Sequence, residues 1–240
     1  MFFSSSLFIA ALVGIVQAQT PSGFTPPVET KLQVIFNTTT VNNPGLELPK
    51  AATASQPQIA ISSAIINSSD TFIFMMLDLD VPPANGSTTR RVLLHAMNTG
   101  FKPTQQKLSG GATLLTSSEK GPAPYLPPSP PATDTVAHRY VQLLFREPSV
   151  LKVQASDFAN TQARINFDVA EFMTANNVGS PVAGNFFRVD GRANAAASGT
   201  ATGTSGTPRS TVQPFEGTAF RADPQMLMGG LLGSLVLFAV

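Results

Sequence analysis

Short hydrophobic segments separated by turns are the feature of this sequence that most restricts its fold. Segments rich in Val, Ile, Phe and Leu, four to seven residues long, lie at 32–36, 58–61, 71–77, 91–97, 139–145 and 185–189. Pro, Gly, Asn and Ser gather between them, as they do in turns. Segments of this length are short for helices but suit β-strands. The sequence therefore predicts a mainly β fold.

One strand and one helix can be predicted in more detail. The segment TFIFMML at 71–77 does not alternate between polar and apolar residues, which predicts a strand buried on both faces. A helix is expected over 167–177, with Asn166 as its N-cap and Gly179 beyond its end. Many strands with few helices predict a β-sandwich or barrel.

The first 18 residues are expected to be a secretory signal peptide. Residues 7–16 form an apolar run of suitable length, and Val16 and Ala18 supply small side chains at the cleavage positions. The alternative is a buried N-terminal strand or helix. With a signal peptide removed, residues 19–192 have the size of one domain with its own core.

The C-terminal part of the chain is expected to lie outside that domain. Residues 193–225 are rich in Ala, Gly, Ser and Thr and lack the large side chains of a core, so they predict a linker or stalk. Residues 226–240 are a hydrophobic tail, shorter than the ~20 residues of a membrane-spanning helix. This pattern predicts a GPI-attachment signal, with Gly217 or Ser210 as the attachment residue. The alternative is a tail that docks on the domain or spans a membrane.

Three Asn-x-Ser/Thr motifs agree with secretion. They place candidate glycosylation sites at Asn37, Asn67 and Asn85, each in turn-like sequence that can accommodate a glycan. Together with the two termini, they predict a protein on the extracellular face of the plasma membrane or in the cell wall, held through a GPI anchor.

Charge and cysteine content exclude several classes of function. The net charge of the 240 residues is +1, and charged residues are 12% of the chain, well below the usual ~25%. No basic patch indicates a nucleic-acid partner or attraction to anionic lipids. The chain has no cysteine, and therefore no thiolate nucleophile and no Cys-based metal site. We expect no cofactor and no metal.

Scarce polar residues accompany the predicted strands. Asp78 and Asp80 follow the strand at 71–77, His95 lies inside the segment at 91–97, and His138 precedes the segment at 139–145. A lone histidine on an apolar face is usually a core residue with its hydrogen bonds satisfied. Because both histidines of the chain share this setting, a common site becomes the better interpretation.

Four features in this order resemble the phosphatidylethanolamine-binding protein family, which includes inhibitors of kinases and carboxypeptidases. They are Asp78-Leu79-Asp80-Val81-Pro82, Leu94-His95, the proline-rich loop at 125–131 and Ala137-His138-Arg139-Tyr140. The stretch PVAGNFFRV at 181–189 is also similar, so the resemblance covers about residues 24–190. Ser129 and Val136 stand where the family prefers glycine.

The resemblance implies a Greek-key β-sandwich with a few short helices and a pocket for a phosphate or carboxylate group. The residues that match the family's pocket are Asp78, His95, Pro130, Pro131, His138 and Tyr140. Protonated imidazoles, a tyrosine hydroxyl and backbone N–H groups can donate to an anion, while Asp78 would orient a histidine or accept from an ammonium group. A phospholipid headgroup that carries both phosphate and amine would use both features.

A structural role is expected for Asp80. A buried carboxylate needs a partner, and Arg139 is the candidate, so that the pair would hold the two motif strands together.

Three functions fit these observations. The first, implied by the resemblance, is a non-enzymatic binding module at the cell surface that could extend to inhibition of a protease or kinase partner. The second is a structural surface protein with a vestigial pocket. The third is a hydrolase that uses His138 or His95 with Asp78, but no Gly-x-Ser-x-Gly motif appears and no serine is placed as a nucleophile. A site of two His and one Asp could also hold a metal, although the resemblance implies binding without one. We expect the first function and no enzymatic activity.

Overall fold

The computed structural model of the chain describes residues 17–193. Most of the predicted signal peptide, nearly all of the predicted stalk, the hydrophobic tail, Gly217 and Ser210 lie outside the described residues. Within 17–193, no helix is long and apolar enough to cross a membrane.

The described residues form a mainly β fold, which confirms the predicted fold class. The strands are β1 (Gln33–Phe36), β2 (Thr39–Thr40), β3 (Leu46–Glu47), β4 (Gln58–Ser62), β5 (Phe72–Val81), β6 (Arg91–Leu108), β7 (Ala112–Thr116), β8 (His138–Arg146) and β9 (Ala183–Val189). Short 3-10 segments are η1 (Lys50–Thr53), η2 (Ser63–Ile65), η3 (Ala155–Phe158) and η4 (Gln162–Arg164), and the α-helix α1 spans Val169–Ala175.

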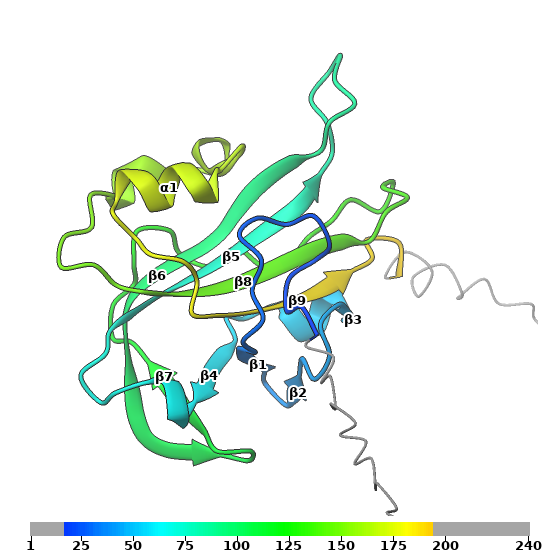
Figure 1. Ribbon diagram of the computed structural model, residues 1–240. Coiled ribbons are helices and arrows are strands. Elements are labelled where there is room, and N and C mark those ends of the chain that lie inside the picture. The colour runs from blue at the N-terminus through cyan, green and yellow to red at the C-terminus, as the bar shows by residue number, and fades with distance from the viewer. Residues whose placement is uncertain (1–16, 194–240) are drawn as a thin grey trace, which may run out of the picture. The chain divides into compact units, whose positions relative to one another are not determined.

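The two layers of the fold are parts of one curled sheet with the strand order β2-β1-β4-β7-β6-β5-β8-β9-β3. The long strand β6 belongs to both layers, because it pairs with β5 as far as Phe101 and with β7 from Lys102 onward. Figure 1 shows β6 bending as it passes from one layer to the other. Shifts of register in these pairings accompany the bend, as expected where a sheet changes direction.

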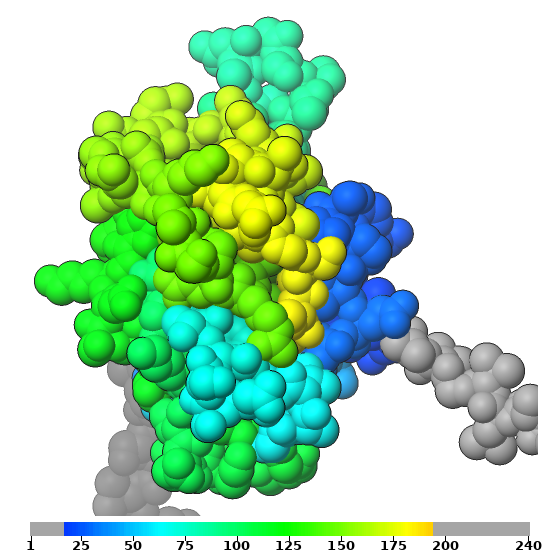
Figure 2. Space-filling model, turned by 60° about the vertical axis from the view of Figure 1, so that its left-hand side comes forward, coloured from blue at the N-terminus to red at the C-terminus, as the bar shows by residue number. Residues whose placement is uncertain are grey.

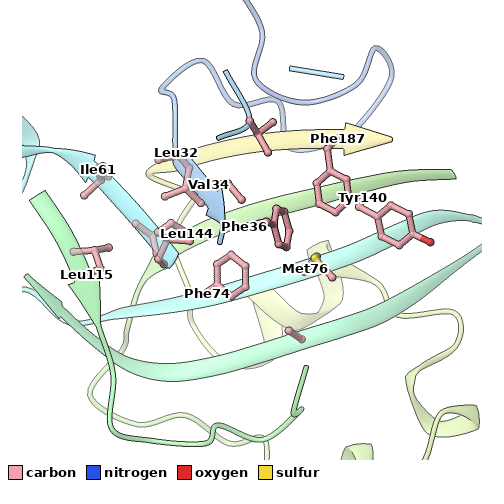
Figure 3. Close-up of a cluster of buried hydrophobic side chains, with 14 of the residues drawn as sticks. Leu32, Val34, Phe36, Ile61, Phe74, Met76, Leu115, Tyr140, Leu144 and Phe187 are labelled. Carbon is pink, nitrogen blue, oxygen red and sulfur yellow. The ribbon is translucent and has the colours of Figure 1, made fainter. Parts of the chain in front are cut away.

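Strand β5 lies at the centre of the core. Its residues 72–77 are fully buried, which confirms the prediction of a strand buried on both faces. Phe72, Phe74 and Met76 face the cluster between the two layers, which Figure 3 shows, and the alternate residues face a second cluster beneath α1. This division follows the two-residue repeat of a β-strand.

The helix α1 is shorter than predicted, and its N-cap is Asp168 rather than Asn166. The Asp168 carboxylate accepts from the backbone N–H groups of Ala170 at 2.8 Å and Glu171 at 3.0 Å. Asn166 has a φ of 62°, and its N–H donates to the carbonyl of Val92 at 2.7 Å. The chain is therefore still bonded to β6 at Asn166, and the helix begins only after it leaves the sheet.

The three asparagines of the glycosylation motifs are exposed. Asn37 lies in the turn between β1 and β2, and Asn67 lies in the loop before β5. Asn85 belongs to the loop between β5 and β6, which projects from the body of the domain in Figures 1 and 2. These positions leave room for a glycan, and glycosylation itself stays a prediction.

Candidate functional site

Four of the predicted site residues come together at one end of the central strands. Asp78 of β5 lies directly opposite Tyr140 of β8, His138 begins β8, and His95 is on β6. All four line one cavity of about 330 Å³. Residues separated by up to 62 positions in the sequence thus share one pocket because β5 pairs with both β6 and β8.

The proline-rich loop before β8 forms another wall of this cavity. It contributes Leu126, Pro127, Ser129 and Pro131, and Thr161 adds to the lining from beyond β8. Pro130, which was expected in the pocket, is buried and does not line it. The backbone carbonyls of Pro130 and Pro131 instead pack so closely on Gly191 that a Cβ there would lie 2.6 and 2.3 Å from their oxygens.

His138 is held between two carboxylates. Its Nδ1 lies 2.8 Å from an oxygen of Asp78, and its Nε2 lies 3.0 Å from an oxygen of Asp134. Ionised carboxylates only accept hydrogen bonds, so both ring nitrogens donate and the imidazole is protonated. Burial alone would lower the pKa of His138, but its bonds to Asp78 and Asp134 raise it above its ordinary value. Neither nitrogen of His138 is then free for a ligand.

Arg90 completes this chain of charges. Its guanidinium donates to both oxygens of Asp134 at 2.8 Å and also to the backbone carbonyl of Asp80. The bonds from Arg90, together with that from His138, hold the pKa of Asp134 well below its ordinary value. The charges of Asp78, His138, Asp134 and Arg90 therefore balance. Asp134 was not predicted as a site residue. Its position only four residues before His138 was the one feature of the sequence that could have suggested it as a partner of that histidine.

His95 differs from His138 because one of its nitrogens is unoccupied. Nδ1 lies 2.8 Å from the carbonyl oxygen of Leu126, an acceptor, and it therefore carries a proton. Burial lowers the pKa of His95, and this effect outweighs the opposing effects of the Leu126 carbonyl and of Asp78. Nε2 has no hydrogen-bond partner within the described residues and lies 3.9 Å from an oxygen of Asp78. In the neutral ring this atom presents a lone pair to the pocket.

The hydroxyl of Tyr140 is a second unpartnered group. It is buried and makes no hydrogen bond of ordinary geometry within residues 17–193, although the Asp78 carboxylate lies near enough to act on it as an acceptor. The ring stacks on Phe187 at a centroid distance of 5.2 Å and meets His95 edge-on at 5.1 Å. Figure 3 shows the hydroxyl pointing away from the hydrophobic cluster that holds the ring. Burial, followed by the charge of Asp78, raises the pKa of Tyr140, so the group remains a phenol that can donate.

Arg164 is a buried cation that sequence reasoning missed. It donates to the carbonyls of Pro124 at 2.7 Å and Phe158 at 3.2 Å, and within the described part of the chain no carboxylate forms an ion pair with it. Its bond to Pro124 joins it to the residue just before the loop that forms the pocket wall, and its positive charge contributes to lowering the pKa of His95. No sequence pattern marked this arginine as different from the exposed ones.

Asp80 and Arg139 form a bidentate ion pair beside the pocket. One oxygen of Asp80 accepts from the backbone N–H and the Nε of Arg139, and the other accepts from Nη2, all at 2.8 Å. Burial alone would raise the pKa of Asp80, but the bonds from Arg139 outweigh it and lower the pKa. Neither residue lines the cavity that holds His95 and Tyr140. Within residues 17–193, no cluster of three or more His, Asp or Glu is arranged to hold a metal ion.

Comparisons with known proteins agree on one family. The family model described as phosphatidylethanolamine-binding protein matches residues 38–187. Phomoidride biosynthesis cluster protein N of Talaromyces stipitatus is 32% identical over 197 residues, which are 76% of this chain and 96% of that protein. The 26 kDa secreted antigen of Toxocara canis is 31% identical over 70% of this chain and 61% of the antigen.

A solved structure agrees in fold. The carboxypeptidase Y inhibitor, determined in complex with its cognate proteinase, superimposes with a TM-score of 0.52 at 22% identity. The match covers 68% of this chain and 84% of the inhibitor. At this identity the likeness shows a shared fold.

Proposed function

The chain belongs to the phosphatidylethanolamine-binding protein family, and from this membership we propose that it is a non-enzymatic binding protein whose pocket takes a phosphate or carboxylate group. The observation that carries this proposal is that two buried atoms of one cavity, Nε2 of His95 and the hydroxyl of Tyr140, make no hydrogen bond of ordinary geometry in the part of the chain that the structure describes. Leaving buried polar groups without partners costs about 1–3 kcal/mol each. A ligand that bonds to both would recover this cost.

Electrostatics support an anionic ligand. The four charges of Asp78, His138, Asp134 and Arg90 balance, and the pKa of His95 is lowered toward the neutral ring. Arg164 then remains as a buried positive charge without a carboxylate partner in the described residues. Charges act more strongly at buried positions than in water, so Arg164 favours a negative group in its neighbourhood.

The hydrolase alternative has less support. Both nitrogens of His138 are bonded to carboxylates, so this histidine has no lone pair with which to act as a general base. His95 is oriented by a backbone carbonyl, and its free nitrogen has no hydroxyl partner within residues 17–193. A nucleophile and base within hydrogen-bond reach, as covalent catalysis requires, are therefore not in place.

A ligand titration followed at the histidine rings tests the proposal. Adding O-phosphoethanolamine or acetate to the ¹⁵N-labelled protein is expected to shift the His95 ring signals in a saturable way, because the ligand would bond to Nε2. The His138 signals should move less, since both of its nitrogens already have partners. Ring signals of His95 that stay unchanged at millimolar concentrations of both probes would refute the proposal.

We also propose that the protein acts at the cell surface, with a protease or kinase as its protein partner. The secreted antigen relative supports secretion, and the inhibitor of the same fold makes a protease the first partner class to consider. Phosphatidylinositol-specific phospholipase C is expected to release the native protein from intact cells if a GPI anchor holds it. Protein that remains on treated cells would argue against the anchor.

A further inference from the structure

His95 and Tyr140 offer a ligand two opposite kinds of hydrogen-bond group. The Tyr140 hydroxyl can donate, because it makes no hydrogen bond of ordinary geometry within residues 17–193 and the nearby Asp78 carboxylate already accepts from His138. Nε2 of a neutral His95 can only accept, because Nδ1 holds the ring proton in its bond to the Leu126 carbonyl. A fully ionised phosphate or carboxylate has acceptors alone, so its oxygen would meet one donor and one repelling lone pair.

The charges around His95 do not remove this mismatch. The groups that face it are Asp78 from β5, His138 and Tyr140 from β8, and the positive charge of Arg164 from η4. Asp78 lies close enough to favour a protonated His95, but its nearer oxygen already accepts from His138. Burial of His95 and the positive charge of Arg164 instead disfavour the protonated ring. Because the effects that lower the pKa of His95 outweigh those that raise it, the neutral ring is favoured.

We propose that the pocket takes an anion only together with one proton, held between a ligand oxygen and Nε2 of His95, and that it therefore prefers a phosphate monoester to a phosphate diester. This inference rests on the proposed anion-binding function. A monoester has a second pKa of about 6, so near neutral pH it can bring the proton as a P–OH group that donates to Nε2. A diester has no such group, and its binding requires a proton on the buried ring itself.

His95 thereby becomes the residue that determines specificity. Either ester can present a non-bridging phosphate oxygen to Tyr140, so the preference does not arise from that contact. It depends on which partner supplies the hydrogen between the phosphate and Nε2. Replacing His95 by a side chain that always carries an N–H donor should therefore abolish the preference for the monoester.

Calorimetry with a matched pair of probes tests the inference on the full chain. O-phosphoethanolamine is the monoester and glycerophosphoethanolamine is the diester, and each is titrated in buffers of different ionisation enthalpy. Near pH 8, each is expected to bind with uptake of about one proton, and affinity should fall about tenfold per pH unit above about pH 7. The monoester should bind more tightly. Binding without proton uptake would overturn the inference and leave the proposed function intact. Failure of both phosphate probes to bind would also overturn the inference, and failure of acetate as well would overturn the proposed function.

The variant His95→Gln separates the role of the ring from that of the ligand. The glutamine amide can present an N–H donor near the position of Nε2 without taking up a proton. Diester binding is then expected to lose its proton uptake, and the preference for the monoester should shrink or vanish. If the variant keeps the uptake and the preference, His95 is not the proton site.

A measurement on the unchanged protein covers the case in which the variant does not fold. In ¹⁵N spectra, Nε2 of His95 should have no proton when the pocket is empty near pH 7.5, while His138 should carry protons on both nitrogens. Saturation with the diester should then protonate Nε2. An Nε2 that stays unprotonated in the diester complex would contradict the inference.

Discussion

Replacing Asp80 by alanine is expected to lower the free energy of unfolding by about 3 kcal/mol. The Asp80 side chain is only 3% exposed, and its oxygens accept three hydrogen bonds from Arg139. Alanine would leave the backbone N–H and the guanidinium of Arg139 without their acceptor, which costs more than the pair itself contributed. Because the Arg139 side chain is 39% exposed, water can bond to its guanidinium in the variant and offset part of the lost stability. The expected loss is therefore at the lower end of the range for broken buried ion pairs.

Urea unfolding of Asp80→Ala and of the matched control Asp190→Ala measures this effect. Asp190 also accepts two hydrogen bonds from an arginine side chain, at 3.0 and 2.8 Å from Arg192, but that pair lies at the exposed end of the domain. The control is expected to unfold at nearly the same urea concentration as the unchanged protein. Equal midpoints for Asp80→Ala and Asp190→Ala would show that the pair with Arg139 does not hold β5 and β8 together.

Replacing Tyr140 by phenylalanine is expected to weaken binding of O-phosphoethanolamine about 10- to 100-fold. This range corresponds to the loss of one hydrogen bond to a charged group, about 1.5–3 kcal/mol. Stability should not fall, because the hydroxyl has no partner within the described residues and its removal relieves the burial of a polar group. The variant should therefore lose ligand affinity while its melting temperature is unchanged or higher.

The only other tyrosine of the chain provides the control for this variant. The hydroxyl of Tyr125 donates to the carbonyl of Thr53 at 2.7 Å, and the residue does not line the pocket. Tyr125→Phe is thus expected to lose about 1 kcal/mol of stability and to bind the ligand as before. If Tyr140→Phe bound as tightly as the unchanged protein, the hydroxyl would not be part of the ligand site.

The sequence predicted the central strands well because their side chains are almost all apolar. The segment 71–77 could be recognised from its composition alone, and the structure fully buries its residues 72–77. The second half of β6 was not predicted, since residues 98–108 are largely polar and include Pro103. Their strand conformation comes from pairing with β7, whose own segment at 112–116 was also missed. Such pairing is a tertiary effect that local pattern does not record.

The sequence pointed to residues that share one cavity, but it did not give the hydrogen bonds that they make. The order of motifs along the chain pointed to Asp78, His95, His138 and Tyr140, and these four do line one cavity. The sequence could not show that His138 lies between two carboxylates, because the second, Asp134, is brought in by the conformation of a loop. Nor could it show which nitrogen of His95 is occupied. Both histidines were expected to bind the ligand, whereas in the structure both nitrogens of His138 are bonded to carboxylates and only Nε2 of His95 lacks a hydrogen bond within the described residues.

A structure of the protein bound to O-phosphoethanolamine would show whether His95 and Tyr140 hold the phosphate. We expect a phosphate oxygen within about 3.2 Å of both Nε2 of His95 and the hydroxyl of Tyr140. We also expect His138 to keep its bonds to Asp78 and Asp134 in the complex. A phosphate bound in this pocket through His138, with Asp78 displaced and Tyr140 still unpartnered, would contradict this expectation.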